Sequence, residues 1–161
     1  MSDLLELLQD FHRDKLTALL RHQAGARFVG QYDFNNTYQY IVNREETQLT
    51  WVAAAIGELG GTPADLQEPD RRVSGSGDAA ERAILEDDAR EAQAFVERWK
   101  PRVDAMSNAR LARMLRVILG EVLEQRRFFE QALAGRTDLL GRRAAVLAPS
   151  HGRVLPSRWI E

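Results

Sequence analysis

Residues 33–63 read DFNNTYQYIVNREETQLTWVAAAIGELGGTP, and this stretch has the pattern of one long helix. Asp33 is a common type of helix N-cap, and a glycine pair followed by a proline is a typical helix stop. The side chains that recur at three- and four-residue steps, and so share one helical face, are Tyr38, Ile41, Glu45, Gln48, Val52, Ala55 and Leu59. This face is apolar at both ends and polar in the middle, where an unpaired buried charge would be costly. We therefore expect a metal, a basic partner or another polar side chain to satisfy Glu45.

Length and composition bound the class of protein before any motif is considered. The chain has 161 residues, 44% of them hydrophobic and 29% charged, which is typical of one globular domain. Its formal net charge of −2 gives no basic excess of the kind that binds nucleic acid, and it contains no cysteine for disulfides or thiolate metal sites. Asp3 and Glu6 differ from the basic start of a signal peptide. We expect a cytoplasmic protein without nucleic-acid or membrane partners.

A first helix is predicted over residues 3–23, with Gly25 as its stop signal. Its apolar stripe consists of Leu5, Leu8, Leu16 and Leu19. His12 lies within this stripe, either hydrogen-bonded to a neighbour at its edge or acting as a ligand that faces Glu45. The connection to the helix of residues 34–60 is short, so the two helices should pack antiparallel.

A long segment without helical periodicity, residues 62–77, follows and contains two prolines. At ~3.3 Å per extended residue it reaches roughly 50 Å, whereas a 25-residue helix is only about 38 Å long. The segment can therefore run the whole length of a bundle. The next helix, residues 78–100, would then start at the far end, and Pro101 should end or kink it.

One turn of this third helix is strongly acidic, with Glu86, Asp87, Asp88 and Glu91. A run of charges is usually a solvated helix face, so most of these carboxylates should be in water. Asp88, and second Glu91, are the candidates to point inward.

A fourth helix is predicted over residues 108–134, again with a face that is apolar at its ends and polar in its middle. The polar positions are Glu121 and Gln125, with Glu124 beside them. The spacing of the two glutamates repeats the Glu-x-x-Gln spacing of the second helix, which indicates a duplicated helical hairpin. Because each lies centrally on its stripe, we expect Glu121 to approach Glu45 inside the bundle at mid-height.

Residues 136–161 form a basic tail without periodicity, separate from a bundle domain of residues 1–135. Its apolar residues Val154, Leu155, Trp159 and Ile160 would be poorly placed in water. We expect the last eight residues to pack on the bundle or on another subunit, and the protein to form a homodimer.

The order helix, short loop, helix, long crossover, helix, short turn, helix resembles the ferritin-like bundles over residues 3–135. Residues 43–49 (NREETQL), leading into 59–63 (LGGTP), resemble the second helix of bacterial ferritin-like and rubrerythrin-related proteins. Residues 120–125 (GEVLEQ) resemble their fourth helix. The resemblance implies an all-α four-helix bundle. In that superfamily two helices each provide a Glu, the other two each provide Glu-x-x-His, and together they hold two iron or manganese ions.

The resemblance also implies a degenerate ligand set. Glu45 matches the glutamate of the second helix, but the histidine position holds Gln48. Glu121 matches the glutamate of the fourth helix, with Glu124 or Gln125 where histidine would be expected. The first helix has no evident inward glutamate. Because an amide oxygen is a weak ligand for iron and manganese, any bound metal should be labile or substoichiometric.

The favoured interpretation is a ferritin-like bundle protein with a degenerate di-metal site that is not a normal ferroxidase. Three hypotheses for its function follow. The first, which is the alternative to that interpretation, is a metal-dependent oxidoreductase or metal-binding protein with iron or manganese as cofactor. Its ligands would be Glu45, Glu121 and Glu124, completed by His12 and by Asp88 or Glu91.

The second hypothesis is a metal-free interaction or structural protein. Glu45 would then be neutralised by Arg or Lys, or protonated and hydrogen-bonded to Gln48 or Gln125. The third is a small-molecule or lipid pocket between the helices. The aromatic side chains that would line it are Tyr38, Trp51, Phe95, Trp99 and Phe128.

Overall fold

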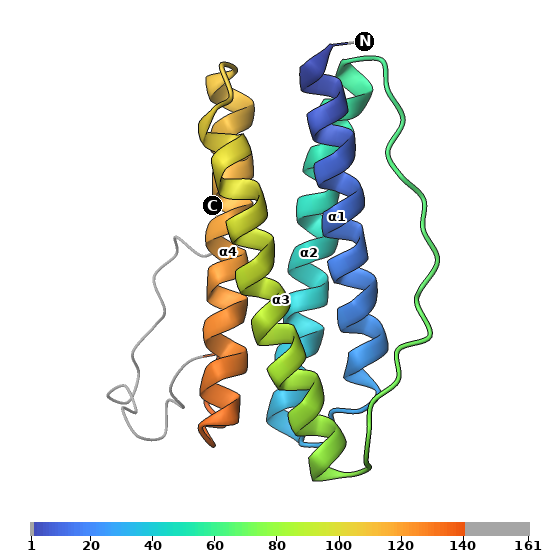
Figure 1. Ribbon diagram of the computed structural model, residues 1–161, viewed down its shortest axis with the longest axis vertical. Helices are drawn as coiled ribbons and strands as arrows, with labels where there is room; N and C mark the ends of the chain where they lie inside the picture. Colours follow the sequence, from blue (N-terminus) through green and yellow to red (C-terminus); the bar gives the residue numbers. More distant parts are fainter. Residues whose placement is uncertain (1, 141–161) are drawn as a thin grey trace, which may run out of the picture.

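Four helices build the molecule, and the computed structural model describes them within residues 2–140 (Figure 1). Their bounds are α1 Asp3–Ala26, α2 Tyr32–Glu58, α3 Asp78–Asp104 and α4 Ala109–Leu133. The predicted all-α bundle is confirmed: α1 packs antiparallel to α2, and α3 packs antiparallel to α4. None of these four helices is both long and apolar enough to cross a membrane. The last eight residues, for which the sequence predicts packing on the bundle or a partner, lie outside the described part of the chain.

The crossover between α2 and α3 runs beside α1 along the length of the bundle (Figure 1). It begins where α2 ends, at Gly60, whose positive φ of 80° suits glycine at the end of a helix. It returns the chain to the opposite end, so that α3 starts beside the start of α2. The crossover therefore spans the length of the bundle, as its number of residues predicts.

Side-chain hydrogen bonds cap the starts of α1 and α2. The hydroxyl of Ser2 caps α1 by accepting a hydrogen bond from the backbone N–H of Leu5 at 3.2 Å. At α2, the Oε1 atom of Gln31 accepts a hydrogen bond from the backbone N–H of Phe34 at 2.7 Å, so the predicted cap at Asp33 is wrong. Gln31 can serve because its own N–H donates to Glu81 of α3 at 2.9 Å, which holds it at the helix entrance.

Two predicted stops lie inside helices. Gly25 does not end α1, which continues to Ala26. Pro101 neither ends nor interrupts α3, which continues to Asp104. Proline removes the hydrogen bond to the carbonyl of Glu97, four residues earlier, but Glu97 is exposed and water can serve that carbonyl.

Two large apolar clusters and a small third one of Leu19, Val42 and Leu49 fill the bundle, and along α2 a polar layer separates the two large clusters. One cluster contains Phe11, Val52, Trp99 and Leu115 among others. The other contains Phe34, Tyr38, Ile84 and Phe129 among others. The buried polar side chains of the described residues are His12, Lys15, His22, Thr37, Glu45, Gln48, Asp88 and Gln125. The pattern of apolar ends and a polar centre, predicted for α2, is therefore the pattern of its core face.

Candidate functional site

The centre of the bundle holds a buried ion pair between α1 and α2. The Nζ atom of Lys15 lies 2.8 Å from Oε2 of Glu45, and both residues are 0% exposed. Both α1 and α2 are long helices whose core faces meet at this level, so neither charge has access to water. Glu45 is thus satisfied by a basic partner, one of the options that the sequence left open.

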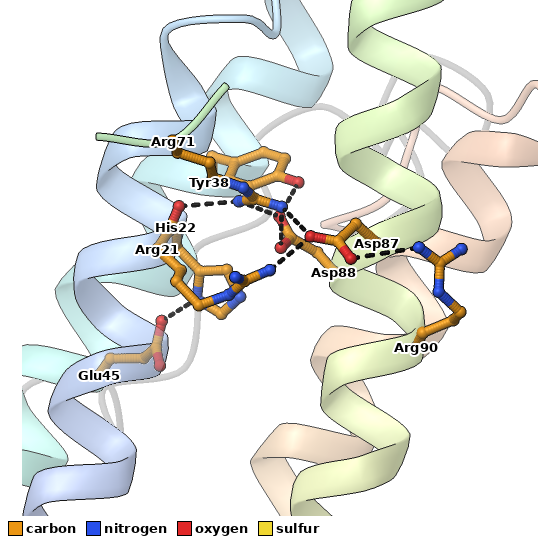
Figure 2. Close-up of polar contacts among 8 residues, drawn as sticks. All are labelled: Arg21, His22, Tyr38, Glu45, Arg71, Asp87, Asp88 and Arg90. Atoms are coloured by element: carbon orange, nitrogen blue, oxygen red, sulfur yellow. Dashed lines mark hydrogen bonds and ion pairs between the residues drawn. The ribbon is translucent and has the colours of Figure 1, made fainter. Parts of the chain in front are cut away.

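His22 binds the second oxygen of the same carboxylate. Its Nδ1 atom lies 2.5 Å from Oε1 of Glu45 (Figure 2). The imidazole ring also packs near Tyr38 and Phe129, with ring centroids 6.1 Å and 5.6 Å away. Lys15, Glu45 and His22 together are called the ion-pair centre below.

Helical spacing is enough to place Lys15 and His22 on the buried face of α1, although the predicted apolar stripe does not include them. With Leu8, Phe11 and Leu19 they recur at steps of three and four residues, and all five side chains are buried. Lysine is seldom assigned to a core because its charge is costly to bury, although its four-carbon stem packs as an apolar chain. The predicted stripe therefore runs through Leu16, one residue away from the buried Lys15.

The ion-pair centre shifts the titration of both its acid and its imidazole. Burial by itself raises the pKa of Glu45, but the charges of His22 and Lys15 and their hydrogen bonds outweigh it and lower that pKa to about 2. Burial by itself lowers the pKa of His22, but the charge and hydrogen bond of Glu45 outweigh it and raise that pKa above 6.5. The carboxylate is therefore ionised at neutral pH, and the imidazole is protonated more readily than in water.

Stability should fall at both ends of the pH range. The depressed pKa of Glu45 contributes on the order of 3 kcal/mol that is present above pH 4.5 and lost as pH falls toward 2. The raised pKa of His22 contributes stability that is complete below pH 6.5 and lost as pH rises through its folded-state pKa. Urea unfolding from pH 3 to 9 checks both limbs. In His22→Gln the alkaline fall should shrink, and an unchanged alkaline limb would contradict the assignment to His22.

A second buried cluster ties the crossover to the bundle (Figure 2). Asp88 of α3 is 1% exposed, and its Oδ1 atom accepts a hydrogen bond from Nη2 of Arg71 at 2.7 Å. Its Oδ2 atom accepts from the hydroxyl of Tyr38 at 2.6 Å and from Nη1 of Arg71 at 3.2 Å. Asp88 does point inward, as predicted, but its partner is an arginine of the crossover. Tyr38, Arg71 and Asp88 are called the crossover clamp below.

The guanidinium of Arg71 reaches α1 as well as α3. Its Nη1 atom donates to the backbone carbonyl of Arg21 at 2.8 Å, and its Nη2 atom donates to Asp87 at 2.9 Å. A Cβ atom at Gly25 would overlap this guanidinium, so glycine leaves the space through which Arg71 enters. Burial by itself raises the pKa of Asp87, but Arg21 and Arg71 outweigh it and lower that pKa.

The remaining predicted ligands lie apart from the ion-pair centre. Glu121 is half-buried between α2 and α4, where Arg44 binds it at 2.5 Å and the side-chain amide of Gln48 donates to it. Glu124 points outward and pairs with Arg127.

Glu91 and His12 complete the set of predicted ligands. Glu91 is exposed. His12 is buried, which lowers its pKa, and its Nδ1 atom has no hydrogen-bond partner among the described residues. The six predicted ligands are thus not brought together. Within residues 2–140 no group of three His, Asp or Glu side chains is arranged to hold a metal ion.

Glu121 lies at the edge of the bundle interior and is half-buried, and its approach to Glu45 stays a prediction. The buried positions of α4 between residues 118 and 129 are Ile118, Leu119, Val122, Gln125, Phe128 and Phe129. Glu121 lies beside this face, where Arg44 of α2 binds it. Val122 and Gln125 form the inward pair at three-residue spacing, in place of Glu121 and Glu124.

Comparisons with known proteins agree with the fold. No protein-family model matches the sequence, and no curated protein matches it significantly. A solved structure of a ferritin-like, diiron-carboxylate protein from Bacillus anthracis str. Ames is similar, with a TM-score of 0.66. The match has 17% sequence identity and covers 83% of this chain and 99% of that chain. The ferritin-like fold predicted from the sequence is therefore confirmed, and at this identity the likeness concerns the fold alone.

The residues around the ion-pair centre do not fit the di-metal site of such a bundle. That site needs inward Glu residues and Glu-x-x-His pairs from the four helices. The buried residues around the centre include Lys15, Gln48, Ala92, Val122 and Gln125, none of which is a carboxylate or an imidazole. Of the two buried carboxylates among the described residues, Glu45 already accepts hydrogen bonds at both oxygens from Lys15 and His22, and Asp88 is bound by Arg71 and Tyr38. The ammonium of Lys15 adds a positive charge where metal cations require negative ligands.

Proposed function

We propose that this protein is a metal-independent member of the ferritin-like bundles, a binding or structural protein rather than a ferroxidase. The observation that carries the proposal is the contact between Lys15 Nζ and Glu45 Oε2, 2.8 Å long with both residues 0% exposed. The ammonium supplies the positive charge that a metal would otherwise bring to this carboxylate. His22 binds the other oxygen, so both carboxylate oxygens of Glu45 already accept a hydrogen bond.

Loading a metal onto Glu45 would require the ammonium of Lys15 to leave. The displaced charge would remain in an apolar surrounding that includes Phe95, and an uncompensated buried charge is strongly unfavourable. The metal-dependent alternative would use Glu45, Glu121 and Glu124. It needs these three carboxylates to converge, whereas Glu121 and Glu124 are each paired with an arginine near the surface. The metal-independent function is therefore favoured.

Elemental analysis tests the proposal directly. The full chain would be produced in medium supplemented with iron and manganese, purified without chelator, and assayed for both metals. We expect well below one metal ion per chain, and a melting temperature that does not change when a chelator is added. A protein that carries two tightly bound ions per chain, or melts earlier after chelation, would overturn the proposal.

Restoring the missing histidine should not restore a metal site. Gln48 is 0% exposed, and its amide donates to Glu121. Gln48→His should therefore lower the free energy of unfolding by about 1–3 kcal/mol through lost pairing and repacking. Gln39→His is the matched control on the exposed face of α2 and should change stability by no more than about 0.5 kcal/mol.

Metal titration of these two variants completes this experiment. Iron and manganese added to Gln48→His should not raise its melting temperature above that of Gln39→His. A Gln48→His protein that binds either metal tightly and becomes more stable than the wild type would show that Glu45 is still available as a ligand.

Homodimer formation and a cytoplasmic location stay predictions from the sequence. We include the homodimer in the proposed function because a binding or structural role is compatible with a second copy. Light scattering of the full chain at several concentrations gives its mass in solution and decides between one copy and two.

A further inference from the structure

A cavity of about 40 Å³ lies beside the ion-pair centre, lined by side chains of α1, α3 and α4 and partly open to solvent where Thr17, Glu91 and Arg98 are exposed. Lys15 and His22 contribute to its wall from α1, and Gln125 contributes from α4. Small side chains create the space, because Ala18 and Ala92 occupy the wall positions between α1 and α3.

The wall presents buried hydrogen-bond donors that the protein does not use fully. The ammonium of Lys15 carries three N–H donors, and Glu45 is its one hydrogen-bond acceptor in the part of the chain that the structure describes. The ring of Phe95, on the same wall, lies with its centroid 5.7 Å from Nζ and offers only a cation–π contact. Donors buried without acceptors are unfavourable. A guest that accepts hydrogen bonds would satisfy them.

The charges of the ion-pair centre select the sign of that guest. Lys15 contributes to the wall, and Glu45 is the one hydrogen-bond acceptor of its ammonium among the described residues. The Nδ1 atom of His22 lies 2.5 Å from the same carboxylate, so two nitrogen groups share this one acidic group. Hydrogen bonds from an ammonium to an anionic acceptor are stronger than those to a neutral one, so an anionic guest is favoured over a cationic one.

Most charges on the outer wall of the cavity are paired with opposite charges. Asp14 is bound by Arg98 at 2.8 Å, and Arg21 is bound to Asp87. Glu91 is exposed to water. The paired charges contribute little net field inside the cavity, and the unpaired one is screened.

The volume sets the size of the guest. A cavity that holds one water molecule needs a volume of roughly 10–15 Å³. A cavity of about 40 Å³ therefore has room for a guest the size of about three water molecules. We propose that this cavity binds a small carboxylate or carbonate-type anion of three or four non-hydrogen atoms, held by the ammonium of Lys15 and the side-chain amide of Gln125. This inference rests on the proposed function, because a metal at Glu45 would displace the ammonium.

Titration of ¹⁵N-labelled full chain with sodium formate, and separately with sodium bicarbonate, tests the proposal. Sodium chloride at equal ionic strength is the control for nonspecific salt effects. We expect a saturable shift of the Gln125 side-chain amide signals with at least one of the two anions. The Kd should lie in the millimolar range because so few atoms make contact.

Two variants identify the cavity as the site. Ala92→Leu fills the cavity and should weaken binding at least tenfold, whereas Ala54→Leu, on the exposed face of α2, should leave the Kd unchanged. If Ala92→Leu does not fold by circular dichroism, Gln125→Leu, followed through the backbone amide signals, replaces it and should also weaken binding at least tenfold. No saturable shift with either anion, or an unchanged Kd in the cavity variant, would overturn the proposal.

Metal content measured on the same samples separates the two proposals. A metal-free protein that binds neither anion overturns the anion site and leaves the proposed function standing. A protein with tightly bound iron or manganese overturns the proposed function itself.

Discussion

Glu45→Leu is expected to lower the free energy of unfolding by about 3–5 kcal/mol, the largest effect that we predict for a single side chain. The substitution removes the carboxylate that both Lys15 and His22 bind, and it leaves the ammonium of Lys15 fully buried without a counter-charge. Urea unfolding followed by circular dichroism measures the loss. Glu58→Leu, in a pair with Arg110 that is exposed on both sides, is the control and should change stability by no more than about 0.5 kcal/mol.

The double variant Lys15→Met with Glu45→Leu distinguishes a buried charge from a simple loss of packing. Both charges then leave together, and apolar side chains of similar volume replace them. We expect the double variant to recover most of the stability that Glu45→Leu loses, because removing a whole buried ion pair is often neutral or stabilising. A Glu45→Leu protein that loses less than about 1 kcal/mol would show that water reaches this pair and would contradict the buried ion-pair centre.

Arg71→Met is expected to lower the free energy of unfolding by about 3–5 kcal/mol and to release the crossover. The side chain of Arg71 is 6% exposed and is the cation that pairs with the buried Asp88. Without it, Asp88 keeps only the hydroxyl of Tyr38 as a partner among the described residues. In limited proteolysis, thermolysin should then cleave within residues 59–77, because cleavage requires a locally flexible backbone.

Arg72→Met is the matched control for this prediction. Its side chain is 86% exposed and pairs with Asp70, which is 75% exposed, so stability and cleavage should stay as in the wild type. Adding Asp88→Asn to Arg71→Met should recover part of the lost stability, because the amide needs no counter-charge and still accepts from Tyr38. Equal cleavage of the Arg71 and Arg72 variants would show that the clamp does not hold the crossover.

Much of the fold could be read from short-range features of the sequence. The three- and four-residue periodicity, the glycine at position 60 and the length of the crossover were enough to predict two antiparallel hairpins joined end to end. The periodicity of a helix and the reach of an extended segment depend only on residues that are close in the sequence, so both can be derived from the sequence alone. The boundaries were less accurate: Gln31 caps α2 through a hydrogen bond with Glu81, fifty residues away, and no local pattern reports that contact.

The candidate site was predicted in part. The polar centre of α2 at Glu45 and Gln48, the inward direction of Asp88 and the burial of Gln125 follow from helical spacing. For Glu121 the helical spacing predicts an interior position, whereas the side chain lies half-buried beside the buried face. One residue rotates a helix position by about 100°, so the stripe of α4 could be placed on either of two adjacent positions.

The sequence by itself determined that a carboxylate stands in the middle of an apolar stripe and that something must neutralise it. Only the tertiary structure decided that Lys15 and His22 do so, and that Arg71 serves Asp88 from a segment without periodicity. The physical reason is that the free energy of a buried charge depends on which opposite charge lies within a few ångströms. That distance is set when the hairpins pack, between residues that are 23 to 30 positions apart at Glu45 and 17 apart at Asp88.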